Sequence, residues 1–261
     1  DKHPYIIKPI YQTENQYSKG VRPTAKFNLP RAKGKYIALC EGDDYWTDPL
    51  KLKKQVDLLE ANPDFSSYFH NTTCVYENGS QECVNYVAPT HKLFFTLYDL
   101  SIKGNFIPTC SIMFRRELLG QLPDWWNTLY ARDWGLHILN SQYGNIGYID
   151  EFMGVYRNHS GGLWSGISYI NQLEATINDC KILRANVDAI NKRAITSFLN
   201  ENYLQLALYH KDNGDLSKSR TCVLNSIGEA ISNACIPTRK MLRILIMTFP
   251  KLHKSLNIPK L

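Results

Sequence analysis

The chain has 261 residues, of which 44% are hydrophobic and 21% charged, and its formal net charge is +6. This composition is ordinary for a globular protein that buries a core, so it excludes a disordered or fibrous chain. No apolar run approaches the roughly 18 residues that span a bilayer, and the first residues do not have the pattern of a signal peptide.

The excess positive charge belongs to the C-terminal tail. No acidic residue follows Glu229, whereas the tail contains Arg239, Lys240, Arg243, Lys251, Lys254 and Lys260. The rest of the chain is balanced, so its charge does not indicate nucleic-acid binding. Residues 239–254 combine basic and bulky apolar residues. This pattern fits a helix lying on an anionic membrane surface, and it fits a helix docked on the domain equally well.

The cysteines are odd in number and scattered, without Cys-x-x-Cys spacing: Cys40, Cys74, Cys83, Cys110, Cys180, Cys222 and Cys235. Two of them, Cys40 and Cys110, lie in apolar runs typical of strands, where a free thiol packs as a small hydrophobe. We interpret all of them as reduced thiols of a cytoplasmic protein.

Residues 5–11 predict a short strand, and residues 12–24 a polar loop. An apolar run over 36–40, flanked by glycines, predicts a buried strand that ends at Asp43 and Asp44. Two adjacent carboxylates in such a place are costly unless something pairs them, and a hard divalent cation is a suitable partner. The alternative is that Asp44 or Asp48 caps a helix that begins near Pro49.

The apolar spacing over 48–61 predicts that helix, and Asn62-Pro63-Asp64 ends it. Residues 65–76 then alternate as a strand, and residues 77–80 form a hairpin turn. His70 is expected to be a half-buried strand histidine. A further helix is expected near 94–100, and residues 104–116 predict a loop, a buried strand and the start of another helix.

Two later segments carry candidate site residues. Asp133, in the stretch Tyr130–His137, stands where a helix begins, so it could be an N-cap or a functional acid. Residues 147–166 predict a strand that runs through Tyr156-Arg157-Asn158-His159 into a glycine-rich loop, which could close over a ligand. From residue 169 onward, long helices are expected over 171–189, 191–212 and 215–233. Residues 204–220 within them faintly resemble one tetratricopeptide-like hairpin.

The run from Arg31 to Leu50 resembles the metal-binding segment of family 2 glycosyltransferases. These are inverting, nucleotide-sugar-dependent enzymes with a GT-A fold, and the segments around Asp133 and His159 resemble two further motifs in the same order. The resemblance implies a mixed α/β sheet with flanking helices over residues 1–168, in which the first nucleotide-binding strands of the family have no counterpart. It leaves 169–261 as a helical C-terminal region with a basic amphipathic tail.

The same resemblance implies roles for individual residues. Asp44 and His159 would bind Mn²⁺ or Mg²⁺, and Asp133 would be the general base. Donor-binding residues would be Asp43, Arg31 and Arg157. Residues that line the acceptor or sugar would be Trp46, Thr109, Cys110, Ser111, Arg132, Trp134 and Trp164. Glu41 stands where many members have Asp, and its longer arm gives no reason to assign it a role.

The expected function is therefore sugar transfer from a nucleotide-diphosphate donor, most simply a UDP-sugar, to a hydroxyl of a glycan or a lipid-linked acceptor. Surface polysaccharide synthesis by a cytoplasmic enzyme, peripheral at the inner face of the membrane, fits this reading. One alternative is a non-catalytic transferase-like module that its helical, basic tail recruits to a partner. Another is a hydrolase that binds metal through Asp43 and Asp44, although such sites usually have more His and carboxylate ligands.

Overall fold

The computed structural model describes residues 3, 5–84 and 92–233. By their contacts these residues divide into two compact units, 1–35 and the part from Tyr36 onward. The first unit contains a 3₁₀ turn, η1 (Tyr17–Lys19), a π-helical turn, η2 (Thr24–Asn28), and α1 (Leu29–Arg31). The strand predicted at 5–11 is wrong. Tyr5 and Tyr11 are 92% and 84% exposed, so these side chains have no sheet to pack against.

The second unit is built on a mixed sheet of seven strands. Its main path has the order β1-β6-β3-β7-β2, formed by β1 (Tyr36–Ala38), β6 (Met113–Arg115), β3 (Phe65–Tyr76), β7 (Asn145–Asn158) and β2 (Tyr45–Trp46). Two further strands lie off this path, because β4 (Gln81–Val84) pairs with β3 and β5 (Phe94–Phe95) pairs with β7. The central pair β3–β7 is parallel and all other pairs are antiparallel. The predicted mixed α/β class is confirmed.

The predicted hairpin is also confirmed. β3 spans the expected residues, and β4 returns after a turn in which Gly79 has a φ of 82°. Glycine adopts this left-handed conformation without strain, which suits it to the turn. His70 is fully buried in β3 rather than half-buried, and its Nδ1 lies 2.7 Å from the backbone oxygen of Asn71. Desolvation lowers the pKa of His70 to about 4, as expected for a structural histidine.

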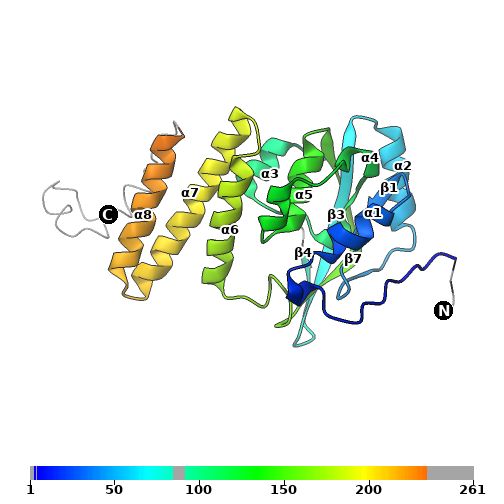
Figure 1. Cartoon of the computed structure of the whole chain (residues 1–261), viewed down its shortest axis with the longest axis horizontal. Coiled ribbons are helices and arrows are strands. Elements are labelled where there is room, and N and C mark those ends of the chain that lie inside the picture. Colours follow the sequence, from blue (N-terminus) through cyan, green and yellow to red (C-terminus); the bar gives the residue numbers. More distant parts are fainter. Residues whose placement is uncertain (1–2, 4, 85–91, 234–261) are drawn as a thin grey trace, which may run out of the picture. The chain divides into compact units, whose positions relative to one another are not determined.

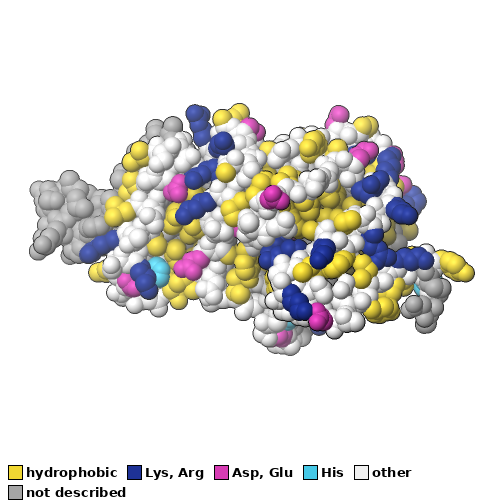
Figure 2. Space-filling view, viewed as in Figure 1, with side chains coloured by type: hydrophobic (Ala, Val, Ile, Leu, Met, Phe, Trp, Pro, Cys, Tyr) yellow, Lys and Arg dark blue, Asp and Glu magenta, His cyan; other side chains and the backbone are white. Residues whose placement is uncertain are grey.

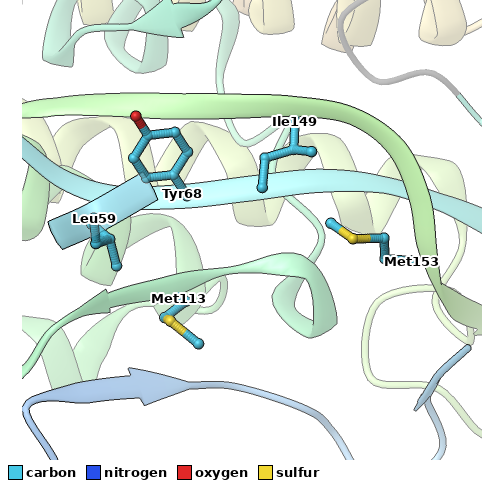
Figure 3. Packing of buried hydrophobic residues seen from close by; sticks show 5 residues of the cluster. All are labelled: Leu59, Tyr68, Met113, Ile149 and Met153. Carbon is cyan, nitrogen blue, oxygen red and sulfur yellow. The ribbon is translucent and has the colours of Figure 1, made fainter. Parts of the chain in front are cut away.

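The helix α2 (Lys51–Ala61) covers one face of the sheet, and its start lies near the expected position. Leu59 of α2 packs with Tyr68, Met113, Ile149 and Met153 of the strands, and Figure 3 shows these five side chains converging. Each is at most 9% exposed. Burial of such apolar side chains, at about 25 cal/mol per Å², is the main source of stability for this layer.

The segment between β5 and β7 carries short helices. The helix expected near 94–100 begins later, as α3 (Leu97–Lys103), because Thr96 and Asp99 form a capping box ahead of it and residues 94–95 join the sheet. The 3₁₀ turn η3 (Thr109–Ser111) precedes β6. The elements α4 (Arg116–Leu119), η4 (Asp124–Thr128) and α5 (Arg132–Ser141) follow it.

The three predicted C-terminal helices are confirmed as α6 (Tyr169–Arg184), α7 (Ala189–Asp212) and α8 (Leu216–Ser232). The hydroxyl of Ser219 donates to the backbone oxygen of Ala207, and that of Ser226 to Asn200, so α7 and α8 run antiparallel. In Figure 1 these helices stand side by side, with α3 and α5 between them and the sheet. Figure 2 shows basic, acidic and apolar side chains interspersed over α6–α8. The basic tail at 239–254 lies outside the described residues.

None of the described helices is both long and apolar enough to cross a membrane. The cysteines Cys40, Cys74, Cys110, Cys180 and Cys222 are free thiols. The helices from Tyr169 onward belong to the same compact unit as the sheet, and the contacts that join them to it bear on the candidate site.

Candidate active site

Three acidic side chains meet in the turn between β1 and β2. The strand predicted over 36–40 ends at Ala38 and is partly buried rather than buried, and Cys40 is exposed. After β1 the N–H of Leu39 donates to the backbone oxygen of Ile112, and the chain then turns through Glu41, Asp43 and Asp44. One carboxylate oxygen from each acid lies within 4.8 Å of the other two. We call these three residues the acid turn. The chain leaves it as β2, which pairs with Val155 and Gly154 of β7.

Asp44 is the most buried member of the acid turn, with 9% of its surface exposed. Its Oδ1 accepts a 2.9 Å hydrogen bond from the backbone N–H of Arg157, just beyond the pairing of β2 with β7. Its Oδ2 is buried and has no N–H or O–H donor in the described part of the chain. Desolvation raises the pKa of Asp44, and the bond from the N–H of Arg157 and a weak one from the thiol of Cys110 partly oppose this. A buried carboxylate oxygen in this state is a suitable ligand for a cation.

Glu41, to which no role was assigned from sequence, belongs to the same cluster. Desolvation and the charges of Asp133, Asp44 and Asp43 raise the pKa of its carboxyl to about 7, while a hydrogen bond from Thr109 lowers it. The longer arm of glutamate therefore does not remove the carboxylate from the group. These carboxylates repel one another, so a positive charge bound among them would stabilise their ionised forms.

Asp133 lies beside the acid turn, in the first turn of α5. It is not the N-cap, a position that Ala131 occupies without a side-chain bond. The Oδ2 of Asp133 accepts hydrogen bonds from the amide of Asn105 at 2.8 Å and from the hydroxyl of Thr109 at 3.2 Å. Thr109 thus lies between Asp133 and Glu41, and its one hydroxyl proton can be donated to either carboxylate but not to both at once, which joins the acid of α5 to the acid turn. Among the described residues, Oδ1 of Asp133 has no donor.

His159 approaches the acid turn from the end of β7. Its Nε2 lies 2.9 Å from Oδ2 of Asp43, so the structure pairs the ring with a carboxylate. The next residue, Ser160, donates to Oε1 of Glu77 from its N–H and from its hydroxyl, at 2.8 and 2.7 Å. These bonds tie the start of the glycine-rich loop to the β3–β4 turn.

The remaining predicted site residues fall into two groups, exposed and buried. Arg157 has an exposed side chain next to the acid turn, and Trp164 is 38% exposed, with its ring centroid 6.0 Å from that of Tyr130. Arg132 is partly buried, and its Nε has no partner in the described structure. Arg31 lies in α1, in the unit formed by residues 1–35, and its role in donor binding stays a prediction.

By contrast, Cys110, Ser111 and Trp134 are buried. Cys110 and Ser111 have no exposed surface, and the hydroxyl of Ser111 donates to Pro108. Trp134 is 2% exposed. In the turn η3, Thr109 contacts the carboxylates, whereas Cys110 and Ser111 pack in the interior behind it.

Trp46 connects the acid turn to this interior. Its indole N–H donates to the backbone oxygen of Cys110 at 2.8 Å, which links β2 to η3. The ammonium of Lys51 lies 4.2 Å from the centre of the Trp46 ring and donates to Gln55 at 2.8 Å. Lys51 is 1% exposed, and burial lowers its pKa to about 8. Such a cation–π contact with little water around it holds the indole firmly.

Sequence reasoning missed two further neighbours of the site. Asn105 contacts Asp133 from a position 28 residues earlier, and its place in the loop predicted at the start of 104–116 was the signal available. Tyr156 is half-buried, and desolvation together with the charges of Asp44, Glu41 and Asp133 raises the pKa of its hydroxyl. Both residues therefore belong to the surroundings of the acids.

The arrangement suits a hard divalent cation. Its donors are oxygens from Glu41, Asp43 and Asp44, with one imidazole nearby, and a buried oxygen of Asp44 has no N–H or O–H donor in the described chain. Oxygen ligands match Mg²⁺, and the added imidazole is acceptable to Mn²⁺. Asp133 is a separate acid at the rim of this cluster, held on one oxygen, so it can accept a proton from a bound hydroxyl.

Comparison with known proteins gives partial similarities. No protein-family model matches the chain. It is 37% identical over 163 residues to uncharacterized proteins of Mycobacterium bovis and Mycobacterium tuberculosis, a match that covers 62% of this chain and 45% of each relative. The aligned part thus spans just under half of those relatives.

A shorter stretch of 55 residues is 38% identical to an Escherichia coli protein, the UDP-Glc:alpha-D-GlcNAc-diphosphoundecaprenol beta-1,3-glucosyltransferase WfaP. This match covers 21% of the chain and 22% of the glucosyltransferase. Part of the chain is therefore similar to a glycosyltransferase.

Proposed function

We propose that the chain is the catalytic part of an inverting, GT-A-like glycosyltransferase of the family 2 type. It transfers a sugar from a nucleotide-diphosphate donor to an acceptor hydroxyl in the synthesis of a surface polysaccharide or glycan. The observation that carries the proposal is the joining of the acid turn to Asp133 through Thr109. It combines a site for a cation with a separate candidate base, as a reaction at a sugar diphosphate requires.

The similarity to the E. coli glucosyltransferase supports the donor and acceptor classes. That enzyme is named for a UDP-glucose donor and an acceptor on diphosphoundecaprenol. We therefore propose a UDP-sugar as donor and a lipid-linked glycan as acceptor. A lipid-linked acceptor lies at a membrane surface, which agrees with peripheral membrane contact through the basic tail.

Asp44, Asp43 and Glu41 would hold Mn²⁺ or Mg²⁺, with His159 oriented by its bond to Asp43. When bound, the ion would neutralise the negative charge of the donor diphosphate. Arg157, exposed beside Asp44, would add a positive charge on the donor side. The ribose would lie near Asp43.

Asp133 would act as the general base. As the acceptor oxygen bonds to the anomeric carbon, the bond from that carbon to the diphosphate oxygen breaks, and the hydroxyl proton passes to the carboxylate. Asn105 and Thr109 hold Oδ2 of Asp133, so Oδ1 is the oxygen placed to accept the proton. Orientation of this kind contributes much of a base's effect, since the hydroxyl oxygen must lie within about 2.6–3.2 Å of the carboxylate oxygen that takes its proton.

The proposal is tested by calorimetric titration of UDP into the protein with and without Mn²⁺, using Asp44→Asn and Asp133→Asn. We expect Mn²⁺-dependent UDP binding in the wild type, its loss in Asp44→Asn, and its retention in Asp133→Asn, which should lack transfer from a UDP-sugar. Asp57→Asn, on the exposed side of α2, is the matched control. Equal loss of UDP binding in both site variants would contradict the division of roles. Absence of binding in the wild type would contradict the choice of UDP.

A further inference from the structure

The C-terminal helices contact the segment that leads into Asp133. Asp179 of α6 is 1% exposed, and its two oxygens accept hydrogen bonds from consecutive backbone N–H groups, Tyr130 to Oδ1 at 2.9 Å and Ala131 to Oδ2 at 2.8 Å. These N–H groups lie immediately before α5, where Asp133 stands in the first turn. The bonds connect residues 48 and 49 positions apart, so they hold two distant parts of the chain together.

This contact lies at the start of a helix that has no side-chain cap, and it binds the two N–H groups that precede the first helical residue, Arg132. Ala131, at the N-cap of α5, has no side chain that can bond to the helix, and a carboxylate at a helix N-terminus is favoured by the helix dipole. Desolvation raises the pKa of Asp179, while the two backbone bonds lower it. A buried carboxylate with both oxygens bonded to backbone is a rigid arrangement, because neither partner can rotate away. It fixes the main chain two residues before Asp133.

A second contact comes from Phe198 of α7. Its ring meets the ring of Trp134 edge to face, with centroids 5.8 Å apart and an interplanar angle of 83°. The same ring fills the space beside Gly104, where an added Cβ would lie 2.3 Å from Cζ of Phe198. Gly104 and Trp134 are the chain neighbours of Asn105 and Asp133, the two residues that are hydrogen bonded to each other. Phe198 therefore packs against a chain neighbour of each member of this pair.

We propose that Asp179 and Phe198 are positioning residues for Asp133, so that α6 and α7 are part of the scaffold of the active site. The inference rests on the proposed function for the role of Asp133, and on geometry for the contacts. The helical region then does more than attach the enzyme to a partner or a membrane. The orientation of the base depends on it.

The helical region also offers a matched control. Asp188 is the N-cap of α7, and its Oδ1 likewise accepts from two backbone N–H groups, those of Ile190 at 2.9 Å and Asn191 at 3.0 Å. Within the described part of the chain, its hydrogen bonds go to the first turn of its own helix. Asp179→Asn and Asp188→Asn are thus the same chemical change at a backbone-binding carboxylate. In Asp179→Asn the amide nitrogen takes the place of one of the two accepting oxygens, so one backbone N–H loses its acceptor, whereas in Asp188→Asn the remaining oxygen can still accept both backbone bonds.

The experiment compares wild type, Asp179→Asn and Asp188→Asn by steady-state transfer kinetics and by hydrogen exchange of the peptide that covers residues 129–135. We expect Asp179→Asn to lower kcat about 10- to 100-fold with the donor KM changed less than twofold, since small misplacement of a reacting group has effects of this size. Exchange at 129–135 should become faster in this variant. Asp188→Asn should keep the wild-type kcat and the wild-type exchange at 129–135.

A kcat of Asp179→Asn equal to that of Asp188→Asn would overturn the proposal, as would a loss that lies entirely in KM. If Asp179→Asn does not fold, Phe198→Leu decides, because it keeps an apolar side chain but loses the edge contact with Trp134. A kcat decrease at constant KM would support the proposal, and an unchanged kcat would contradict it. If the wild type transfers no sugar, the proposed function fails. Unchanged exchange at 129–135 in Asp179→Asn would separately refute the positioning contact.

Discussion

Replacing Glu41 by glutamine should stabilise the metal-free protein at neutral pH. The carboxyl of Glu41 shares a small space with Asp43 and Asp44, close enough for one oxygen of each to lie within 4.8 Å of the others. Desolvation and the neighbouring charges raise the pKa of Glu41 to about 7 from an ordinary value of 4.5. Glutamine keeps the shape and the hydrogen-bonding oxygen but removes one charge from the cluster.

The magnitude follows from this difference in pKa. The pKa of Glu41 is about 2.5 higher than its ordinary value, which corresponds to a loss of about 3.4 kcal/mol in the free energy of unfolding. This figure is an upper limit. The side chain of Glu41 is exposed on one side, where water screens the repulsion, so we expect about 1 kcal/mol. Because the folded state has the higher pKa, this destabilisation is absent below pH 4.5. It develops as the pH rises from 4.5 to 7 and is complete above pH 7.

The assay is urea denaturation with EDTA, followed by tryptophan fluorescence, for the wild type and Glu41→Gln at pH 4.5 and pH 8. The free energy of unfolding of the variant should exceed that of the wild type by about 1 kcal/mol more at pH 8 than at pH 4.5. Glu117→Gln, at an exposed position in α4, is the control and should show the same difference at both pH values.

A Glu41→Gln variant that is less stable than the wild type at pH 8 would refute the reasoning, because the glutamate would then be stabilising. The same would follow from a stability difference that does not change with pH. Mn²⁺ should reverse the order at pH 8, since a bound cation favours the carboxylate over the amide.

Two further predictions concern the interior. Gly147→Ala should lower the free energy of unfolding by about 3 kcal/mol in urea denaturation, because the new Cβ would lie 2.0 Å from the ring of Tyr68. The control is Gly228→Ala in α8, where a new Cβ meets open space, and it should be neutral or slightly stabilising. Lys51→Met should gain stability relative to the wild type below pH 8, since burial lowers the pKa of Lys51 to about 8 from 10.5. This relative gain should disappear as the pH rises from 8 to 10.5, and a gain that persists at pH 10.5 would exclude the buried ammonium as its cause.

The elements that could be predicted from sequence are those whose local pattern is long. The apolar spacing of the three C-terminal helices and the alternation before the turn at Gly79 are properties of their own residues. The strand expected at 5–11 failed because an apolar run does not indicate whether a neighbouring strand exists. The start of α3 was misplaced because Phe94 and Phe95 belong to the sheet through pairing with β7, which their own sequence does not show.

The candidate site was predictable where a motif is contiguous. Asp43 and Asp44 follow an apolar run that predicts a strand, so their chemistry could be inferred before their positions were known. Glu41 was assigned no role, because the length of its side chain was considered without the packing that brings its carboxylate close to those of Asp43 and Asp44. Asn105 and Asp179 contact the Asp133 segment across 28 and 49 residues, and no local pattern encodes contacts over such distances.

The placement of the acid turn also bears on how the protein folds. The strands β1 and β2 are separated by residues 39–44 only, yet they stand at opposite ends of the strand order. The connection between them can take its native path only after the intervening strands, which come from later parts of the chain, have assembled. Pairing between distant segments is slow because the loop-closure entropy is lost first. The carboxylates therefore remain hydrated, and far less repulsive, until the last stage of folding. We therefore expect substitutions of these carboxylates to change the rate of unfolding much more than the rate of folding.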